Sequence, residues 1–342
     1  MTKTQSTART SHWKRSLLAL LLLAALVMSG CTAQAEKTTA SATYFNTAVM
    51  FTLYDAPSGL VDELMKECER YEKLLSRTIE GSDVSRINGA NGETVTVDPE
   101  TWEILRRAKE ISAMTGGAFS VTIAAETTQW DFTGGTKRMP TDEERLAAIE
   151  LVDDNQLVLG ENNTVTLPKG MMIDLGGIAK GYIADRLAEM VRGKVSGAIL
   201  NFGGNVYLIG HKPDGTPFRT GVANPKNSAT HLVVITLTDQ SVVTSGTYER
   251  YFTRDGVTYH HILDPETGLP AETNLAGATI ILESSMDADA IATACIVFGL
   301  EQSLSFLNEH DIDGVLIDGD NNVYVTKNLA DRYPVALAAP AE

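Results

Sequence analysis

The 342-residue chain has few basic residues, few cysteines and no long hydrophobic segment. Its 28 lysines and arginines stand against 44 acids, which gives a formal net charge of −16. Nonspecific binding to nucleic acid needs a basic surface, so this balance argues against nucleic acid as a partner. The hydrophobic and charged fractions, 43% and 21%, are those of an ordinary globular protein.

The three cysteines, Cys31, Cys68 and Cys295, are too few for a disulfide-rich scaffold. Cys68 falls at helical spacing with apolar residues in "LMKECERYEKLL", and Cys295 lies in the apolar run "AIATACIVF". We therefore expect Cys68 and Cys295 to be buried thiols without a catalytic role. The chain has no C-x-x-C or H-x-x-x-H pair to suggest a zinc site.

The longest apolar run near the start, "LLALLLLAALVM" at 17–28, has twelve residues, too few to span a bilayer comfortably. It follows basic residues and precedes small ones, which is the pattern of a secretory signal. The run ends in "MSGC", which resembles the signal box of bacterial lipoproteins, whose cysteine becomes the lipidated first residue. A transmembrane anchor and a plain secreted chain are the alternatives.

We therefore expect a cleaved signal peptide over 1–30, a lipidated Cys31 and a flexible polar tether over 31–42. The protein would be exported and held by lipid at the outer face of the bacterial cytoplasmic membrane, or would face the periplasm.

The rest of the chain mixes helical and strand patterns without regular βαβ alternation, which predicts an α+β fold with mixed, mainly antiparallel sheets packed by helices. No Pro/Ser linker and no fixed-period repeat divides it. We expect one domain over 43–330 and a C-terminal tail over 331–342. Helices are expected at about 60–76, 99–114, 141–152, 179–193, 285–299 and 301–310, and short strands dominate 198–261.

The segment "MIDLGGIAKGY", 172–182, places Asp174, Gly176, Gly177 and Lys180 together at the expected start of a helix. Glycines let backbone approach a ligand, and a helix N-terminus attracts anions. Neither the Walker nor the dinucleotide pattern is met. A phosphate-binding turn and a tight strand–helix turn with Asp174 as cap both remain open.

Two further segments carry polar groups in suggestive patterns. In "SMDADAIATA", 285–294, Asp289 and Thr293 share one helix face and offer oxygen atoms of the kind Mg²⁺ binds. The alternative is an acidic helix start capped by Ser284 or Ser285. In "YHHILDPETGLP", 259–270, His260 and His261 would point to opposite faces of a strand, so that one could face a site.

These segments resemble the FAD:protein FMN transferases, the ApbE-type lipoproteins. The similarity runs from Phe45 to about Gly299. The motifs that carry it occur in the same order: "LLSRTIEGSDVSRIN", "TGGAF", "IDLGGIAKGY", "NFGGNVYLIG", "TSGTYERYF", "HILDPETGLP" and "DADAIATA".

The resemblance implies a Mg²⁺-dependent enzyme that cleaves FAD, its substrate, and attaches FMN through its phosphate to a threonine or serine of a second protein, with release of AMP. Such acceptors are flavoproteins, for example subunits of membrane redox-driven ion pumps. The implied metal ligands are Asp289 and Thr293, with backbone at Gly177 and Ala292. The implied catalytic residues are His261 and Asp289, either of which could be the base. The implied FAD contacts are Thr78, Ala118, Phe119, Ser120, Asp174, Lys180 and backbone near Leu263.

The chain departs from the family pattern at three places. Phe45-Asn46-Thr47 stands where Met-Gly-Thr or Met-Asp-Thr is frequent, Thr78 where an aromatic is common, and Ser120 where an acid is common. Two alternatives remain. A Mg²⁺-dependent FAD pyrophosphatase would use the same metal and phosphate residues, and a flavin-binding lipoprotein would bind FAD without catalysis.

Overall fold

The computed structural model describes residues 36–338, and Lys37 opens the compact unit to which the following elements belong. The helices are α2 (Leu60–Leu75), α3 (Asp83–Gly89), α4 (Pro99–Met114), α5 (Ala124–Thr127), α6 (Asp142–Ile149), the 3₁₀ helix η1 (Asp154–Gln156), α7 (Ala179–Val191), α8 (Ser285–Glu309) and α9 (Leu329–Arg332). The strands are β1 (Lys37–Tyr44), β2 (Thr47–Tyr54), β3 (Thr94–Thr96), β4 (Val158–Gly160), β5 (Thr164–Thr166), β6 (Gly197–Phe202), β7 (Asn205–Gly210), β8 (Phe218–Asn224), β9 (Asn227–Leu237), β10 (Gln240–Gly246), β11 (Tyr251–Arg254), β12 (Val257–His260), β13 (Leu275–Leu282), β14 (Asp313–Asp318), β15 (Val323–Val325) and β16 (Val335–Leu337).

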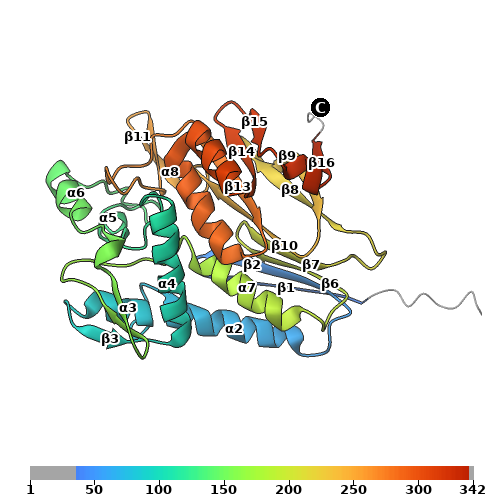
Figure 1. Cartoon of the computed structure of the whole chain (residues 1–342), viewed down its shortest axis with the longest axis horizontal. Helices are drawn as coiled ribbons and strands as arrows, with labels where there is room; N and C mark the ends of the chain where they lie inside the picture. The colour runs from blue at the N-terminus through green and yellow to red at the C-terminus, as the bar shows by residue number, and fades with distance from the viewer. Residues whose placement is uncertain (1–35, 339–342) are drawn as a thin grey trace, which may run out of the picture. The chain divides into compact units, whose positions relative to one another are not determined.

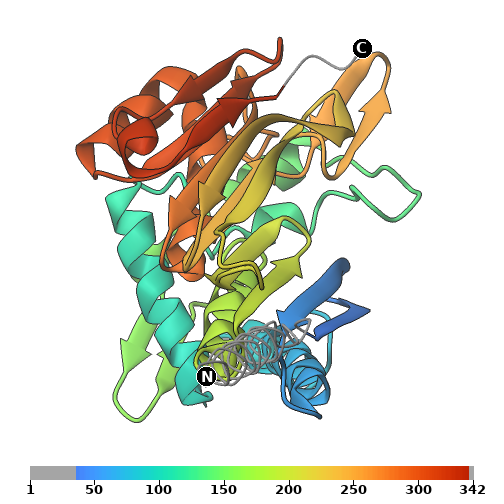
Figure 2. The same cartoon turned by 90° about the vertical axis from the view of Figure 1, so that its right-hand side faces the viewer.

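The central element is an eight-stranded sheet in the order β1-β2-β6-β7-β10-β13-β14-β15, and all of its neighbouring pairs are antiparallel. Figure 2 shows this sheet running from β1 and β2 in blue to β14 and β15 in red. Three smaller sheets accompany it, with the orders β16-β9-β8, β3-β5-β4 and β11-β12. The expected α+β architecture with mainly antiparallel sheets is confirmed.

Consecutive residues of the central strands face different layers, because side chains alternate along a strand. On β10, Val242 packs in a cluster with β8 and β9, whereas Val243 packs in the cluster that contains the helices. Ile281 and Ile280 on β13 divide in the same way. The helices therefore cover one face of the sheet, and the β16-β9-β8 sheet covers the other.

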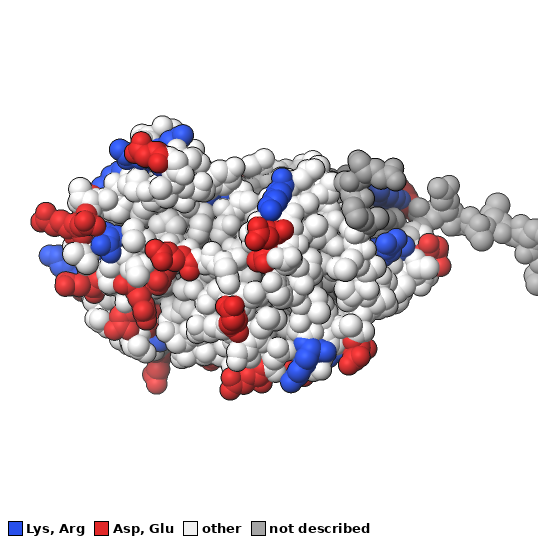
Figure 3. All heavy atoms as spheres, turned by 90° about the horizontal axis from the view of Figure 1, so that it is seen from above, with Lys and Arg blue, Asp and Glu red and all other residues white. Residues whose placement is uncertain are grey.

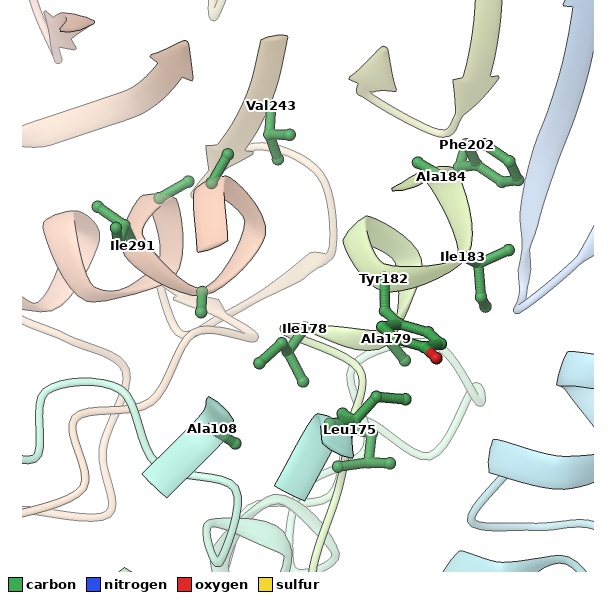
Figure 4. Packing of buried hydrophobic residues seen from close by; sticks show 14 of the residues in the cluster. Ala108, Leu175, Ile178, Ala179, Tyr182, Ile183, Ala184, Phe202, Val243 and Ile291 are labelled. Atoms are coloured by element: carbon green, nitrogen blue, oxygen red, sulfur yellow. The ribbon is translucent and has the colours of Figure 1, made fainter. Parts of the chain in front are cut away.

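Helices α7 and α8 lie side by side against the sheet (Figure 1), with α4 beside them. Figure 4 shows Ile178, just before α7, among these three helices, with Ala108 of α4 and Ile291 of α8 to its left. All three side chains are almost fully buried. This packing fixes the place where the segment 172–182 meets α8.

Both ends of the expected domain were placed wrongly. Residues 37–42, expected to belong to the tether, form most of β1, which pairs with β2 along its whole length. Phe45 and Asn46 form the two-residue turn between them, with φ of 55° and 56°, as hairpin turns of this type require. The tail expected over 331–342 contains the end of α9 and β16, which pairs with β9. The sequence missed β1 because this edge strand is polar and pairs through its backbone.

Helix α8 is kinked where a helix boundary was expected. Gly299 has φ 73° and ψ −177° within the span of α8, so residues 285–298 and 300–309 form two helical segments. Among residues 36–338, α8 is the one helix whose length and apolar composition would suffice to cross a membrane, and half of its most apolar stretch is buried. In this fold α8 packs on β10, β13 and α7 as a core helix.

Candidate functional site

Lys180 of α7 and Asp289 of α8 meet where the two helices contact. The Lys180 ammonium lies 3.1 and 3.2 Å from the two carboxylate oxygens of Asp289, and the Gly181 N–H donates to the same carboxylate over 3.1 Å. The Asp289 side chain is only 3% exposed, so its charge is balanced by protein groups rather than by water. Residues 109 positions apart thus form one polar centre.

Gly181 makes this meeting possible. A Cβ at Gly181 would lie 2.2 Å from the backbone oxygen of Ser285, a distance that no side chain tolerates. The absence of a side chain lets the backbones of α7 and α8 touch. Asp289 lies one turn beyond Ser285, and its side chain leans back toward the helix N-terminus, as helical side chains do.

The other expected metal ligands lie beside this pair. The Thr293 hydroxyl lies 3.2 Å from the Asp289 carbonyl oxygen and 3.4 Å from the Ser245 hydroxyl on β10. A Cβ built at Gly177 would be 3.5 Å from the Thr293 hydroxyl and 3.3 Å from the ring of Phe119. Gly177 therefore lies directly against Thr293. Ala292 is fully buried next to Thr293, and its role as a backbone ligand stays a prediction.

Helix α7, which begins at Ala179 within the segment 172–182, has no side-chain cap. Ile178 is the N-cap of α7 and makes no side-chain cap bond. The Asp174 carboxylate instead accepts the Gly176 N–H at 2.8 Å and lies 3.2 Å from the guanidinium of Arg77. The cap interpretation of Asp174 is therefore wrong. Ser284 does cap α8, accepting the Asp287 N–H at 3.2 Å.

The expected FAD contacts Thr78 and Ala118–Ser120 lie in two segments that adjoin Asp174. Thr78 adjoins Arg77, and its hydroxyl is exposed and bonds with Ser76. The loop that contains Ala118, Phe119 and Ser120 continues to Val121, whose carbonyl accepts the Asp174 N–H at 2.8 Å.

Ser120 is paired with an acid of this chain's own. The hydroxyl of Ser120, the hydroxyl of Thr122 and the N–H of Thr122 all donate to one oxygen of Asp154, at 2.8 to 3.0 Å. Asp154 lies on η1 and is buried. Ser120 therefore lies against a buried carboxylate that comes from a different segment of the chain.

The two neighbouring histidines have different surroundings, and His261 lies just beyond the end of β12. His260 is buried, and its Nε2 lies 3.2 Å from the carbonyl oxygen of Ala271. Burial, followed by the charges of Arg250, His260 and Lys180, lowers the pKa of His261 to about 4. The charge of Lys180 makes the smallest of these contributions. Leu263, two residues on, is buried against Trp130 and Phe252.

Glu249 is a fourth titratable group beside the pair. Its side chain reaches solvent, yet desolvation by the surrounding protein raises its pKa to about 7; Lys180 and Arg250 oppose this rise, and Asp289 adds to it. A Cβ at Gly204 would lie 3.8 Å from its carboxylate, so Glu249 also borders the Gly203-Gly204 turn. A carboxylate with a pKa near neutrality is a candidate for proton transfer.

The oxygen atoms of the site fit Mg²⁺. Asp289, Thr293 and the Gly177 backbone supply a carboxylate, a hydroxyl and a carbonyl, all ligands that this ion accepts. The Lys180 ammonium contacts both carboxylate oxygens of Asp289 and also donates to the Gly176 carbonyl oxygen over 2.9 Å. This position therefore already holds a positive charge. Residues 36–338 contain no cluster of three or more His, Cys, Asp or Glu side chains suited to a metal, and Mg²⁺ would keep waters or use substrate phosphates.

Comparison with known proteins agrees with this geometry. The family model described as "ApbE family" matches residues 38–316. The chain belongs to the ApbE family. Two curated relatives named "FAD:protein FMN transferase" are each 33% identical: one from Treponema pallidum, aligned over 80% of this chain and 81% of the relative, and one from Klebsiella pneumoniae, over 86% and 93%. The crystal structure of the ApbE protein from Thermotoga maritima superposes with a TM-score of 0.81 at 30% identity, covering 86% of this chain and 98% of that one.

Several site residues were missed although they lie within the ApbE family motifs. Ser245 and Glu249 belong to "TSGTYERYF", and Gly181 to "IDLGGIAKGY". Arg77 follows Ser76 in the first motif. Their roles depend on which distant segment they face, and no spacing along the chain carries that information. Cys68 and Cys295 are buried, as expected, and burial raises the pKa of both thiols to about 12.

Proposed function

We propose that this ApbE family member is a Mg²⁺-dependent FAD:protein FMN transferase. A new P–O bond forms between the FMN phosphorus and the oxygen of a threonine or serine of the acceptor. The bond from that phosphorus to the AMP phosphate breaks, and AMP leaves. The observation that carries the proposal is the meeting of Lys180 and Asp289 at 3.1 Å beside Gly177 and Thr293.

Phosphoryl transfer depends on positioning and on neutralising charge. Lys180 offers a fixed positive charge for the diphosphate of FAD. Mg²⁺ held by Asp289, Thr293 and backbone at Gly177 and Ala292 supplies further charge neutralisation when bound. Arg77, beside Asp174 and Thr78, adds a second cation at the expected FAD-binding turn.

His261 is the better candidate for the base that takes the proton of the acceptor hydroxyl. Its pKa of about 4 keeps the imidazole neutral at pH 7, so that it can accept a proton. Both oxygens of Asp289 lie against the Lys180 ammonium and one accepts the Gly181 N–H, so this carboxylate is placed to hold positive charge. We therefore assign Asp289 to the metal and His261 to the proton.

The remaining FAD contacts and the cellular setting follow the family. Thr78, Ala118–Ser120, Asp174 and the backbone at Leu263 would bind FAD. The acceptor would be a flavoprotein, such as a subunit of a membrane redox-driven ion pump. Cys31 and the signal peptide lie outside the described residues, and we propose that a lipid on Cys31 holds the exported protein at the membrane. Replacing Cys31 by Ser should release the protein from the membrane fraction.

The activity is tested by incubating the protein with FAD, Mg²⁺ and candidate acceptors. AMP release and flavin fluorescence on the acceptor in a denaturing gel should rise together. AMP without protein-bound flavin across several acceptors would indicate FAD hydrolysis instead. Bound FAD that stays intact with Mg²⁺ would indicate a flavin-binding protein and overturn both enzyme proposals.

A further inference from the structure

Asp185 on α7 caps the N-terminus of α8. Its carboxylate accepts the backbone N–H groups of Ser285 at 2.7 Å and Met286 at 2.9 Å, and the Ser284 hydroxyl lies 3.5 Å away. The first amides of a helix have no partner within that helix. Asp185 supplies one from the neighbouring helix, and its negative charge suits the positive end of α8.

This cap lies one helical turn from the polar centre on both helices. Along α7, Asp185 follows Gly181 by four residues, and along α8, Asp289 follows Ser285 by four. Gly181 touches Ser285 and also donates its N–H to Asp289. The same pair of turns therefore carries the backbone contact, the Asp185 cap and the carboxylate of Asp289.

The position of α8 along α7 decides whether Asp289 reaches its partners. Its hydrogen bonds to Lys180 and Gly181 are 3.1 Å long, and hydrogen bonds weaken steeply beyond about 3.5 Å. Apolar packing holds α8 against α7, but the hydrophobic effect behind it is not directional and does not by itself set hydrogen-bond lengths. The two short hydrogen bonds that Asp185 accepts from the consecutive amides of Ser285 and Met286 are directional and oppose a shift of α8 along α7.

We propose that Asp185 is a positioning residue, which fixes α8 against α7 so that Asp289 and Thr293 face Gly177 as a divalent-cation site. This inference rests on the proposed function, since it assumes that the site takes Mg²⁺. Asp185 itself does not touch the cation. Outer residues that orient metal ligands typically contribute a factor of 10 to 100 in metal affinity.

The chain provides a matched control in Asp287, on the same first turn of α8. Its carboxylate pairs with the Arg107 guanidinium at 2.6 and 2.8 Å, which ties α8 to α4 rather than to α7. Asp287→Asn removes a charge and an interhelical tie from the same turn of α8, and it leaves in place the hydrogen bonds that Asp185 accepts from Ser285 and Met286. A general loss of helix anchoring would affect both variants equally.

The experiment measures Mn²⁺ binding to the full chain in detergent by the loss of the electron paramagnetic resonance signal of free Mn²⁺. Work at pH 8 keeps Asp185 ionised, because burial raises its pKa to about 7. We expect Asp185→Asn to raise the Mn²⁺ Kd by about 10- to 100-fold, and Asp287→Asn by less than about threefold. Asparagine offers one acceptor oxygen and turns an amide N–H₂ toward the second backbone donor.

A second variant keeps the test decisive if Asp185→Asn does not fold. Asp185→Glu retains both oxygens and the charge but adds one methylene, so its Kd should lie between those of the unaltered chain and the asparagine variant. A folded Asp185→Asn variant that binds Mn²⁺ within about threefold of the unaltered chain would overturn the inference. If that variant does not fold, Asp185→Glu with the Kd of the unaltered chain would overturn it, and so would an equal effect of Asp287→Asn. Failure of the unaltered chain to bind Mn²⁺ would instead refute the proposed metal site, and this inference with it.

Discussion

The buried carboxylate of Glu126 should make the stability of this protein depend on pH. Glu126 lies on α5 and is 1% exposed, and neither of its oxygens has a hydrogen-bond partner among the described residues. Burial, with a contribution from Asp264, raises its pKa from 4.5 to about 8, and Arg145 opposes the rise. A charged carboxylate without a hydrogen bond is unfavourable in such a place.

The magnitude follows from proton linkage. Between pH 4.5 and about 8 the folded state keeps the Glu126 proton that the unfolded chain loses. Stability therefore falls by about 1.4 kcal/mol for each pH unit as pH rises through this window. From pH 5 to pH 8 the loss is about 4 kcal/mol, an upper value if the site relaxes or admits water. This contribution is fully present below the unfolded pKa and absent above the folded one.

Replacing Glu126 by Gln removes the titrating group and keeps its shape. Urea unfolding at pH 5, 6.5 and 8 should show a small difference between the two proteins at pH 5 and a growing advantage of Glu126→Gln at higher pH. The control is Glu143→Gln on α6, an exposed residue, which should leave the pH dependence unchanged. Equal slopes of stability against pH for the unaltered chain and Glu126→Gln would refute the reasoning.

Three other substitutions or measurements address the site. Gly181→Ala should push α7 and α8 apart and cost about 1–3 kcal/mol of unfolding free energy. The control is Gly89→Ala on α3, where a Cβ meets nothing within 4 Å, and this change should be neutral or slightly stabilising. Equal losses of stability for the two variants in urea unfolding would contradict this account. If His261 is the base, kcat/KM at saturating Mg²⁺ should stay constant down to about pH 5 and fall with an apparent pKa near 4, while a fall near pH 7 that Glu249→Gln abolishes would point to Glu249. Asp289→Ala should abolish Mg²⁺-dependent AMP release, and full activity in that variant would rule out the proposed metal ligand.

The sequence predicted most of the fold because the main elements have strong local signals. Helix α4 begins at Pro99 with the side chain of Asp98 as its cap and ends before Gly116, as the stop and start patterns indicate. The hairpin of β4 and β5 turns at Asn162 and Asn163, which both have positive φ. The failures include the short helices α3, α5 and α9 and the edge strands β1 and β16. Strand β1 is polar and pairs within a hairpin, β16 pairs with a strand distant in sequence, and neither shows a long apolar pattern.

The candidate site was less accessible to sequence reasoning. The resemblance brought Asp289 and Lys180 to the same function, and the structure brings them into contact. Glu249 could not be distinguished from an ordinary surface acid, because its raised pKa depends on the tertiary surroundings. Asp154 escaped notice for the same reason, since its partners Ser120 and Thr122 lie on a separate segment.

Figure 3 shows acidic and basic side chains interspersed on the face seen from above, with wide stretches that carry no charge. The formal net charge of −16 nonetheless makes the long-range field of the chain negative on balance.

The alternation of strand β10 limits how this protein can change length during evolution. Val243 and Ser245 face the helices, whereas Val242 faces the β16-β9-β8 sheet on the other side. Loss of one residue within β10 would exchange the two layers and turn the Ser245 hydroxyl away from Thr293. Insertions and deletions in homologous chains should therefore occur in the exposed turn at Asp255 and Gly256, and be absent from β10.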